Sequence, residues 1–107
     1  MKRLNVFDVE EKERPINRKT RMFVNPQGDI SAENFIMGQV VIEPGGKVPM
    51  EQHANEEAYL IVEGTGKMTI GEETETVSDM ESNQQHQIIN DSDKELKFIF
   101  VAAPNTK

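Results

Sequence analysis

The 107-residue sequence contains no cysteine, no tryptophan and a single tyrosine, and histidine occurs only twice. The lack of cysteine excludes disulfide bonds and thiolate chemistry, and it is compatible with a reducing compartment. The sequence also lacks the run of about 18 apolar residues that a membrane-spanning helix needs, and the apolar run of a signal peptide does not follow Met1. These absences predict a cytoplasmic protein with no membrane partner.

Positive charge is also scarce relative to negative charge. The 19 acidic residues outnumber the 12 basic residues, and the formal net charge is −7. Nucleic-acid phosphates are bound by clusters of lysine and arginine, so we expect no nucleic-acid partner. The length fits one domain that is large enough to bury a core.

The composition changes after residue 21. Residues 1–21 are strongly charged and predict an N-terminal charged arm or short strand, and residues 22–107 predict the domain itself. Short runs rich in β-branched and aromatic residues follow, separated by turns rich in glycine, proline and asparagine, with no helical periodicity. The pattern predicts an all-β sandwich or barrel, with strands at residues 34–43, 57–63, 67–70, 74–77 and 96–102.

Both histidines lie in tracts that contain other metal-binding residue types. Glu51 and His53 are two residues apart, so on an extended strand they project to the same side, and Glu57 and His86 can join them from neighbouring segments. Two imidazoles with one or two carboxylates suit Mn²⁺, Fe²⁺, Co²⁺ or Ni²⁺, with Zn²⁺ as a further option, and leave positions open for a substrate. The alternative is that the histidines are surface or hydrogen-bonded polar groups and that Glu51 is a solvated carboxylate at a strand edge.

The tract from Gly45 to Gly64, which contains His53, resembles the first signature of the cupin superfamily, G-x5-H-x-H-x3-4-E-x6-G. It matches at four positions, which are Gly45, His53, Glu57 and Gly64, while Glu51 stands where the family has its first histidine. The resemblance implies a small single-domain cupin with a double-stranded β-helix (jelly-roll) barrel. It also implies a metal held by His53, Glu57 and His86, with Glu51 at the fourth ligand position.

The second family signature, G-x5-P-x-G-x2-H-x3-N, is matched only in part. His86 and Asn90 are kept, and the segment between Asp79 and His86 is about three residues shorter than in the family. Asn90 lies in a run of turn-forming residues and is predicted to stabilise a turn. We expect Tyr59, two residues after Glu57, either to line the pocket or to pack in the core, and Gln39 to line the pocket, although the sequence does not fix which side of its strand Gln39 occupies.

Several functions follow from this interpretation, and the sequence does not choose among them. The first is a metal-dependent enzyme of dioxygenase, decarboxylase or isomerase type that acts on a small oxygen-rich molecule, such as an organic acid, dicarbonyl, sugar acid or phenol. The second is a non-catalytic module that binds a small molecule or a metal. The third is a structural or interaction role without a metal. The resemblance also implies a homodimer, with the charged N-terminal arm as a candidate for crossing to the partner.

Overall fold

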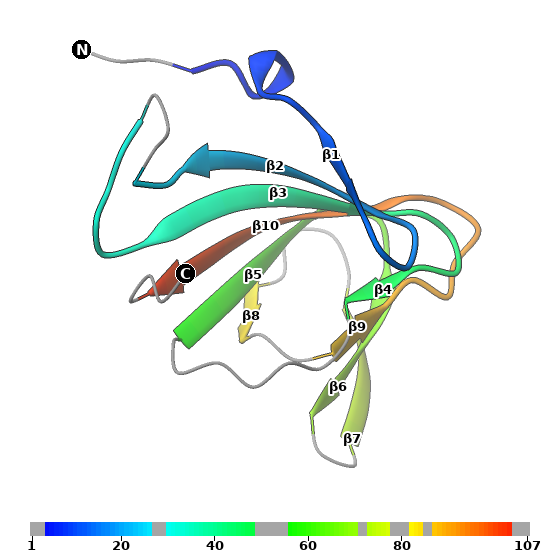
Figure 1. Ribbon diagram of the computed structural model, residues 1–107. Coiled ribbons are helices and arrows are strands. Elements are labelled where there is room, and N and C mark those ends of the chain that lie inside the picture. The colour runs from blue at the N-terminus through cyan, green and yellow to red at the C-terminus, as the bar shows by residue number, and fades with distance from the viewer. Residues whose placement is uncertain are drawn as a thin grey trace.

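The computed structural model of the chain describes residues 4–26, 30–48, 56–70, 73–77, 82–84 and 87–103 (Figure 1). Within these ranges the chain forms antiparallel β structure and one short 3-10 helix, η1 (Val6–Asp8). No helix among the described residues is long and apolar enough to cross a membrane. The predicted all-β fold is confirmed.

The strands form two sheets that face each other (Figure 1). The six-stranded sheet has the order β1 (Lys12–Arg14), β2 (Arg18–Val24), β3 (Ile36–Ile42), β10 (Leu96–Ala103), β5 (Glu56–Glu63) and β8 (Ser82–Gln84). The four-stranded sheet has the order β4 (Lys47–Val48), β9 (Gln87–Ile89), β6 (Gly66–Ile70) and β7 (Glu73–Val77). Neighbours such as β3 and β10 are far apart in sequence, so the sheets depend on long-range pairing.

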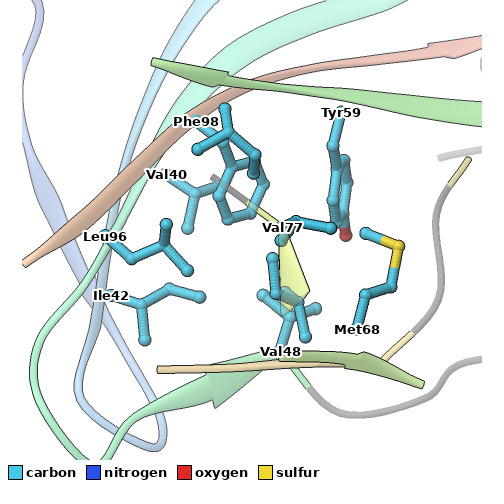
Figure 2. Packing of buried hydrophobic residues seen from close by; sticks show 10 residues of the cluster. Val40, Ile42, Val48, Tyr59, Met68, Val77, Leu96 and Phe98 are labelled. Atoms are coloured by element: carbon cyan, nitrogen blue, oxygen red, sulfur yellow. The ribbon is translucent and has the colours of Figure 1, made fainter. Parts of the chain in front are cut away.

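Side chains that alternate along the strands fill the space between the two sheets. Val40 and Ile42 of β3, for example, are buried, and Phe98 of β10 is fully buried between the sheets. Figure 2 shows such side chains from both sheets converging on one cluster. Its buried members are Val40, Ile42, Val48, Tyr59, Ile61, Met68, Val77, Ile88, Leu96 and Phe98. This apolar cluster is the core that holds the two sheets together.

Asn90 is a fully buried polar residue at the end of β9. Its side-chain nitrogen donates hydrogen bonds to the carbonyl oxygens of Ile42 (2.8 Å) and Lys94 (2.7 Å). Its side-chain oxygen accepts hydrogen bonds from the backbone N–H (3.0 Å) and the hydroxyl (2.7 Å) of Ser92. The predicted role of Asn90 in stabilising a turn is therefore confirmed.

The turn between β1 and β2 packs on the glycine-containing turn that follows β3. The turn residues Ile16 and Asn17 have φ angles of 63° and 53°, in the left-handed region. Their carbonyl oxygens accept hydrogen bonds from the backbone N–H groups of Lys47 (3.2 Å) and Glu43 (3.0 Å). A Cβ atom on Gly46 would lie 2.7 Å from both carbonyl oxygens, so this position has room only for glycine.

An ion pair lies beside the same turn. The amine of Lys19 is 3.1 Å from the carboxylate of Glu43, and this hydrogen-bonded partner holds the pKa of Lys19 above its ordinary value of 10.5. Because the raised pKa favours the charged amine, the stabilisation that comes from the charge of Lys19 is present at neutral pH and is lost as the pH rises through that raised value.

The N-terminal segment, residues 5–14, is attached to the outer face of the six-stranded sheet through Arg21 of β2. The Arg21 guanidinium donates to the carbonyl oxygen of Val9 (3.2 Å), lies 3.5 Å from the carboxylate of Glu11, and stands 5.6 Å from the centre of the Phe7 ring. Strand β2 begins at Arg18, within the segment assigned from the sequence to the N-terminal arm. It pairs with β3 along its length.

Candidate metal centre

Three of the four predicted metal ligands, which are Glu51, His53 and His86, lie outside the described residues. The fourth, Glu57, is the second residue of β5, and its backbone pairs with Ala102 of β10. Among the described residues, no three histidine, cysteine, aspartate or glutamate side chains come together as a metal site would require. The predicted ligand set therefore stays a prediction.

The described strands on either side of the two ligand-bearing segments are paired with each other. Residues 49–55 connect β4 to β5, and residues 85–86 connect β8 to β9. Strand β4 pairs with β9 through Val48 and Ile88, and strand β5 pairs with β8 through Ala58 and Gln84. The two segments therefore begin and end beside each other. One end of each lies where β4 pairs with β9, and the other end lies where β5 pairs with β8, next to Glu57.

A row of four paired residues crosses the inner face of the six-stranded sheet beside Glu57. Gly38 of β3 pairs with Met22 on one side and with Phe100 on the other, and Phe100 pairs in turn with Tyr59. We call Met22, Gly38, Phe100 and Tyr59 the inner row. The next pair of the same alternation toward the chain end of β10, two residues on, joins Glu57 to Ala102. The inner row therefore lies next to Glu57 in the sheet, and Glu57 is the one predicted ligand whose strand pairing is described.

Tyr59 belongs to the core as well as to the inner row. Its side chain is 4 % exposed, and its ring centre lies 4.3 Å from that of Phe98 with the two planes tilted by 32°. Figure 2 shows the ring between Phe98 and Met68. The core packing that the sequence left open for Tyr59 is confirmed.

Gln39 lies on the other side of its strand. Its neighbours Gly38 and Val40 face the interior, and side chains alternate along a strand. The Gln39 carboxamide oxygen accepts a hydrogen bond from the Arg21 guanidinium at 3.5 Å, on the outer face to which the N-terminal segment is attached. The prediction that Gln39 lines the pocket is therefore corrected, because the strand places this residue outside the barrel.

The sequence interpretation did not single out Met22, Gly38 or Phe100. A glycine inside an apolar strand signals a close approach of neighbouring groups, and here a Cβ atom on Gly38 would lie 2.8 Å from a ring carbon of Phe100 and 3.0 Å from the sulfur of Met22. Gly38 was therefore the signal that could have located the inner row. Its partners, however, follow only from the register of the sheet.

Comparison with solved structures shows the same fold in other proteins. The polyketide cyclase RemF from Streptomyces resistomycificus is 21% identical, with 98% of this chain and 80% of that chain covered at a TM-score of 0.82. Ectoine synthase from P. lautus is 14% identical, with 100% of this chain and 80% of that chain covered at a TM-score of 0.80. A predicted oxalate decarboxylase from Thermotoga maritima is 16% identical, with 97% of this chain and 100% of that chain covered at a TM-score of 0.81. At these identities the similarity shows the jelly-roll fold alone.

Comparison with curated protein sequences gives no match. The family profile described as "Cupin domain" matches residues 38–102, which is more than half of the chain. This range includes β5, most of β3 and β10, the inner row apart from Met22, and all four predicted ligands. The chain therefore belongs to the cupin domain family.

Proposed function

We propose that the protein is a metal-dependent enzyme that acts on a small oxygen-rich molecule inside the barrel. The ligands would be His53, Glu57 and His86, with Glu51 at the fourth position. This donor set of imidazole nitrogen and carboxylate oxygen fits Mn²⁺, Fe²⁺, Co²⁺, Ni²⁺ or Zn²⁺. The site would lie where the two ligand-bearing segments adjoin β5.

The pairing of the flanking strands is the observation that carries this proposal. His53 and His86 are more than thirty residues apart in sequence, yet the described strands at both ends of their two segments are paired with each other. At one of these ends Ala58 pairs with Gln84, so Glu57 is one residue from the contact. Such bracketing supports the convergence of the four predicted ligands from distant parts of the sequence.

The chemistry that a metal would supply is the polarisation of a substrate oxygen, with open coordination positions for a chelating molecule. The chain's own residues would orient and protect that molecule. Glu51 or Glu57 would carry a proton when it is not bound to the metal. The apolar core behind Tyr59 excludes water from that side of the interior. Dioxygenation, decarboxylation and isomerisation are the reaction types that fit such a centre.

Metal analysis of untagged protein tests the proposal. We expect near-stoichiometric divalent metal in the purified or reconstituted protein, loss of that metal in His53→Ala and Glu57→Gln, and retention in Glu56→Gln, which changes the neighbouring glutamate. Far-UV circular dichroism checks that each variant is folded. Reconstituted protein with no bound metal, or equal metal in all variants, would contradict the proposed centre.

A non-catalytic module that binds a metal or small molecule is the second candidate. It is favoured by Glu51 at the position of the first family histidine and by the short segment before His86. The metal-loaded protein separates the two candidates when it is incubated with chelating organic acids and phenols. Product formation or oxygen consumption supports the enzyme, whereas binding without turnover supports the module.

We also propose that the chain forms a homodimer in the cytoplasm. The outer face of β5 and β10 exposes Leu60, Val62 and Val101 by 37 %, 39 % and 38 %. Apolar groups gathered on one sheet face are typical of a contact surface, and a two-fold axis would let this face cover its own copy. Light scattering after size-exclusion chromatography should give the mass of two chains, and a single-chain mass at micromolar concentration would remove this proposal.

A further inference from the structure

We propose that the inner row selects ligands that carry a flat unsaturated ring, with the ring against Phe100 and the ligand's oxygen atoms toward Glu57. This inference rests on the proposed function, because it assigns the ligand class to the same interior site. It narrows the oxygen-rich molecules considered above to aromatic or similarly planar ones and disfavours saturated sugars and sugar acids.

The partial exposure of Phe100 indicates open space at the inner face of the six-stranded sheet. Phe98 and Ala102 lie two residues before and after Phe100 on β10, and both are completely buried, whereas Phe100 is only partly buried. Strand β10 is central in its sheet, with β3 on one side and β5 on the other, so Phe100 is not exposed at a sheet edge. The exposed part of the ring therefore faces the interior of the barrel.

Gly38 brings two soft, polarisable groups together at this place. Because Gly38 has no side chain, a ring carbon of Phe100 and the sulfur of Met22 both lie within 3.0 Å of the position that its Cβ would take. Met22 is also partly exposed. Phe100 and Met22 thus present an aromatic and thioether surface, and the buried Tyr59 continues the same row of the sheet into the core.

This surface has little capacity for hydrogen bonding. Within the inner row, the hydroxyl of Tyr59 is the only polar side-chain group. A polyol placed against it would leave hydroxyl groups without partners, which costs about 1–3 kcal/mol for each buried group. A planar ring loses no hydrogen bond there, and it gains edge or stacking contacts with Phe100 and a sulfur contact with Met22.

The register of the sheet orients the ligand. Glu57 pairs with Ala102, two residues beyond Phe100 along β10, so the predicted metal lies on one side of the inner row. The core residues Phe98 and Ile61 form the next pair on the other side and are fully buried. A ligand that chelates the metal can therefore extend its ring over Phe100, but it cannot continue beyond the inner row.

Three hydroxamates with the same chelating group test this selection. Binding to the metal-loaded protein is measured for benzohydroxamate, cyclohexanecarbohydroxamate and acetohydroxamate by titration, with ¹³C-methyl NMR of the methionines as the structural readout. We expect benzohydroxamate to bind about three- to tenfold more tightly than the cyclohexane analogue, which corresponds to one aromatic contact. We also expect a ring-current shift of the Met22 methyl signal, assigned with Met22→Leu.

The variant Phe100→Leu keeps the side chain apolar and removes the ring. It should abolish the preference for benzohydroxamate while metal content and acetohydroxamate binding are retained, and Lys97→Ala on the outer face of the same strand should keep the preference. If Phe100→Leu does not fold, Met22→Leu provides the second test through a weakened preference. Equal binding of the three hydroxamates, or a preference that survives in Phe100→Leu, would overturn the inference.

A metal-free arm separates this inference from the proposed metal centre. In protein treated with EDTA, benzyl alcohol at millimolar concentration should shift the Met22 methyl signal and bind more tightly than cyclohexylmethanol. If no metal binds but this shift is seen, the proposed enzyme fails and the ring-selective surface stands. If the metal and the hydroxamates bind without a preference for the planar ring, the metal centre stands and the ring selectivity fails.

Discussion

At the scale of single residues, Asn90 shows how one polar side chain can fix the meeting point of two chain segments. Its amide is fully buried and makes two donated and two accepted hydrogen bonds. A buried polar group is tolerated when its hydrogen bonds are satisfied, and it becomes costly when a partner is lost. Asn90 therefore links the end of β3 to the turn before β10.

The variant Asn90→Ala should lower the free energy of unfolding by about 3–5 kcal/mol, because it leaves the carbonyl oxygens of Ile42 and Lys94 without the amide donor and also opens a cavity. Urea denaturation followed by circular dichroism measures this loss. The exposed Asn34→Ala is the matched control and should change the stability by less than about 0.5 kcal/mol. A loss below about 1 kcal/mol in Asn90→Ala would show that water replaces the amide.

Asn90→Asp tests the loss of the donors together with a buried charge and without a cavity, since the two side chains are nearly equal in size. An ionised carboxylate cannot donate to Ile42 and Lys94, and its charge would be buried. We expect this variant to be destabilised at neutral pH and to recover part of its stability as the pH falls and the carboxyl group becomes protonated. Unfolding measured at several pH values checks the direction, and a pH-independent loss would contradict it.

At the scale of elements, the turn between β1 and β2 combines a close fit with an unfavourable residue. Two successive left-handed residues suit the tight turns of hairpins, which favour asparagine and glycine. Asn17 satisfies that preference, but Ile16 is β-branched and adopts a φ of 63°. Such a conformation costs about 1–3 kcal/mol, and it persists here because the carbonyl oxygens of both residues are bound by the turn after β3.

Replacing Ile16 by asparagine should relieve that strain and raise the unfolding free energy by about 0.5–1.5 kcal/mol. Ile16 is 43 % exposed, and the apolar burial that the change to asparagine gives up offsets part of the relieved strain. Ile16→Val is the matched control, since it keeps the β-branched side chain and should give no gain. Thermal unfolding of the three proteins compares them, and a Tm of Ile16→Asn at or below that of the original chain would mean that the isoleucine side chain contributes more than its backbone costs.

The long apolar strands could be predicted from the sequence, whereas the charged strand β2 and the shortest strands could not. Strands β3, β5 and β10 are apolar runs that end at proline or glycine, so both their type and their bounds were close to those observed. Strands β4, β8 and β9 have only two or three residues, which is too few to show a period. The register between strands is also absent from any local pattern, because it depends on pairing across the sheet.

In the candidate site too, local sequence patterns predicted some features, whereas features that depend on pairing across the sheet could not be predicted. The family signature identified Glu57 and the fold around it, and β5 begins where that signature predicts a strand. The inner row could not be derived, because Met22, Gly38 and Phe100 become neighbours only through pairing of β2, β3 and β10. For Gln39, the prediction was wrong because a shift of one residue exchanges the two faces of a strand, and the sequence of β3 is apolar on both faces.

At the scale of the whole molecule, the N-terminal segment is part of the folded unit. Strand β1 pairs with β2, and the Arg21 guanidinium holds the preceding residues through Val9, Glu11 and the face of the Phe7 ring. The same guanidinium donates to Gln39, so one side chain connects the segment to both β2 and β3. Phe7 itself is 77 % exposed, and the segment buries little apolar surface of its own. Its attachment therefore rests on polar contacts, which are the pairing of β1 with β2 and the contacts of Arg21.

The variant Arg21→Lys should loosen this segment without unfolding the barrel, because an ammonium group cannot reproduce the planar set of donors. We expect amide hydrogen exchange in residues 5–14 to become faster by one to two orders of magnitude, which corresponds to about 1.4–2.7 kcal/mol of local stability. Exchange in β3, β5 and β10 should stay unchanged, since the core cluster makes no use of Arg21.

Lys97→Ala is the control. It removes another ion pair on the outer face of the same sheet, in which the amine of Lys97 lies 3.7 Å from the carboxylate of Glu63 on β5. This variant should leave exchange in residues 5–14 unchanged. If Arg21→Lys also speeds exchange throughout β3 and β10, the N-terminal segment and the barrel unfold as a single cooperative unit. If it changes nothing, the pairing of β1 with β2 is sufficient to hold the segment, and Arg21 is then a surface contact of little energetic weight.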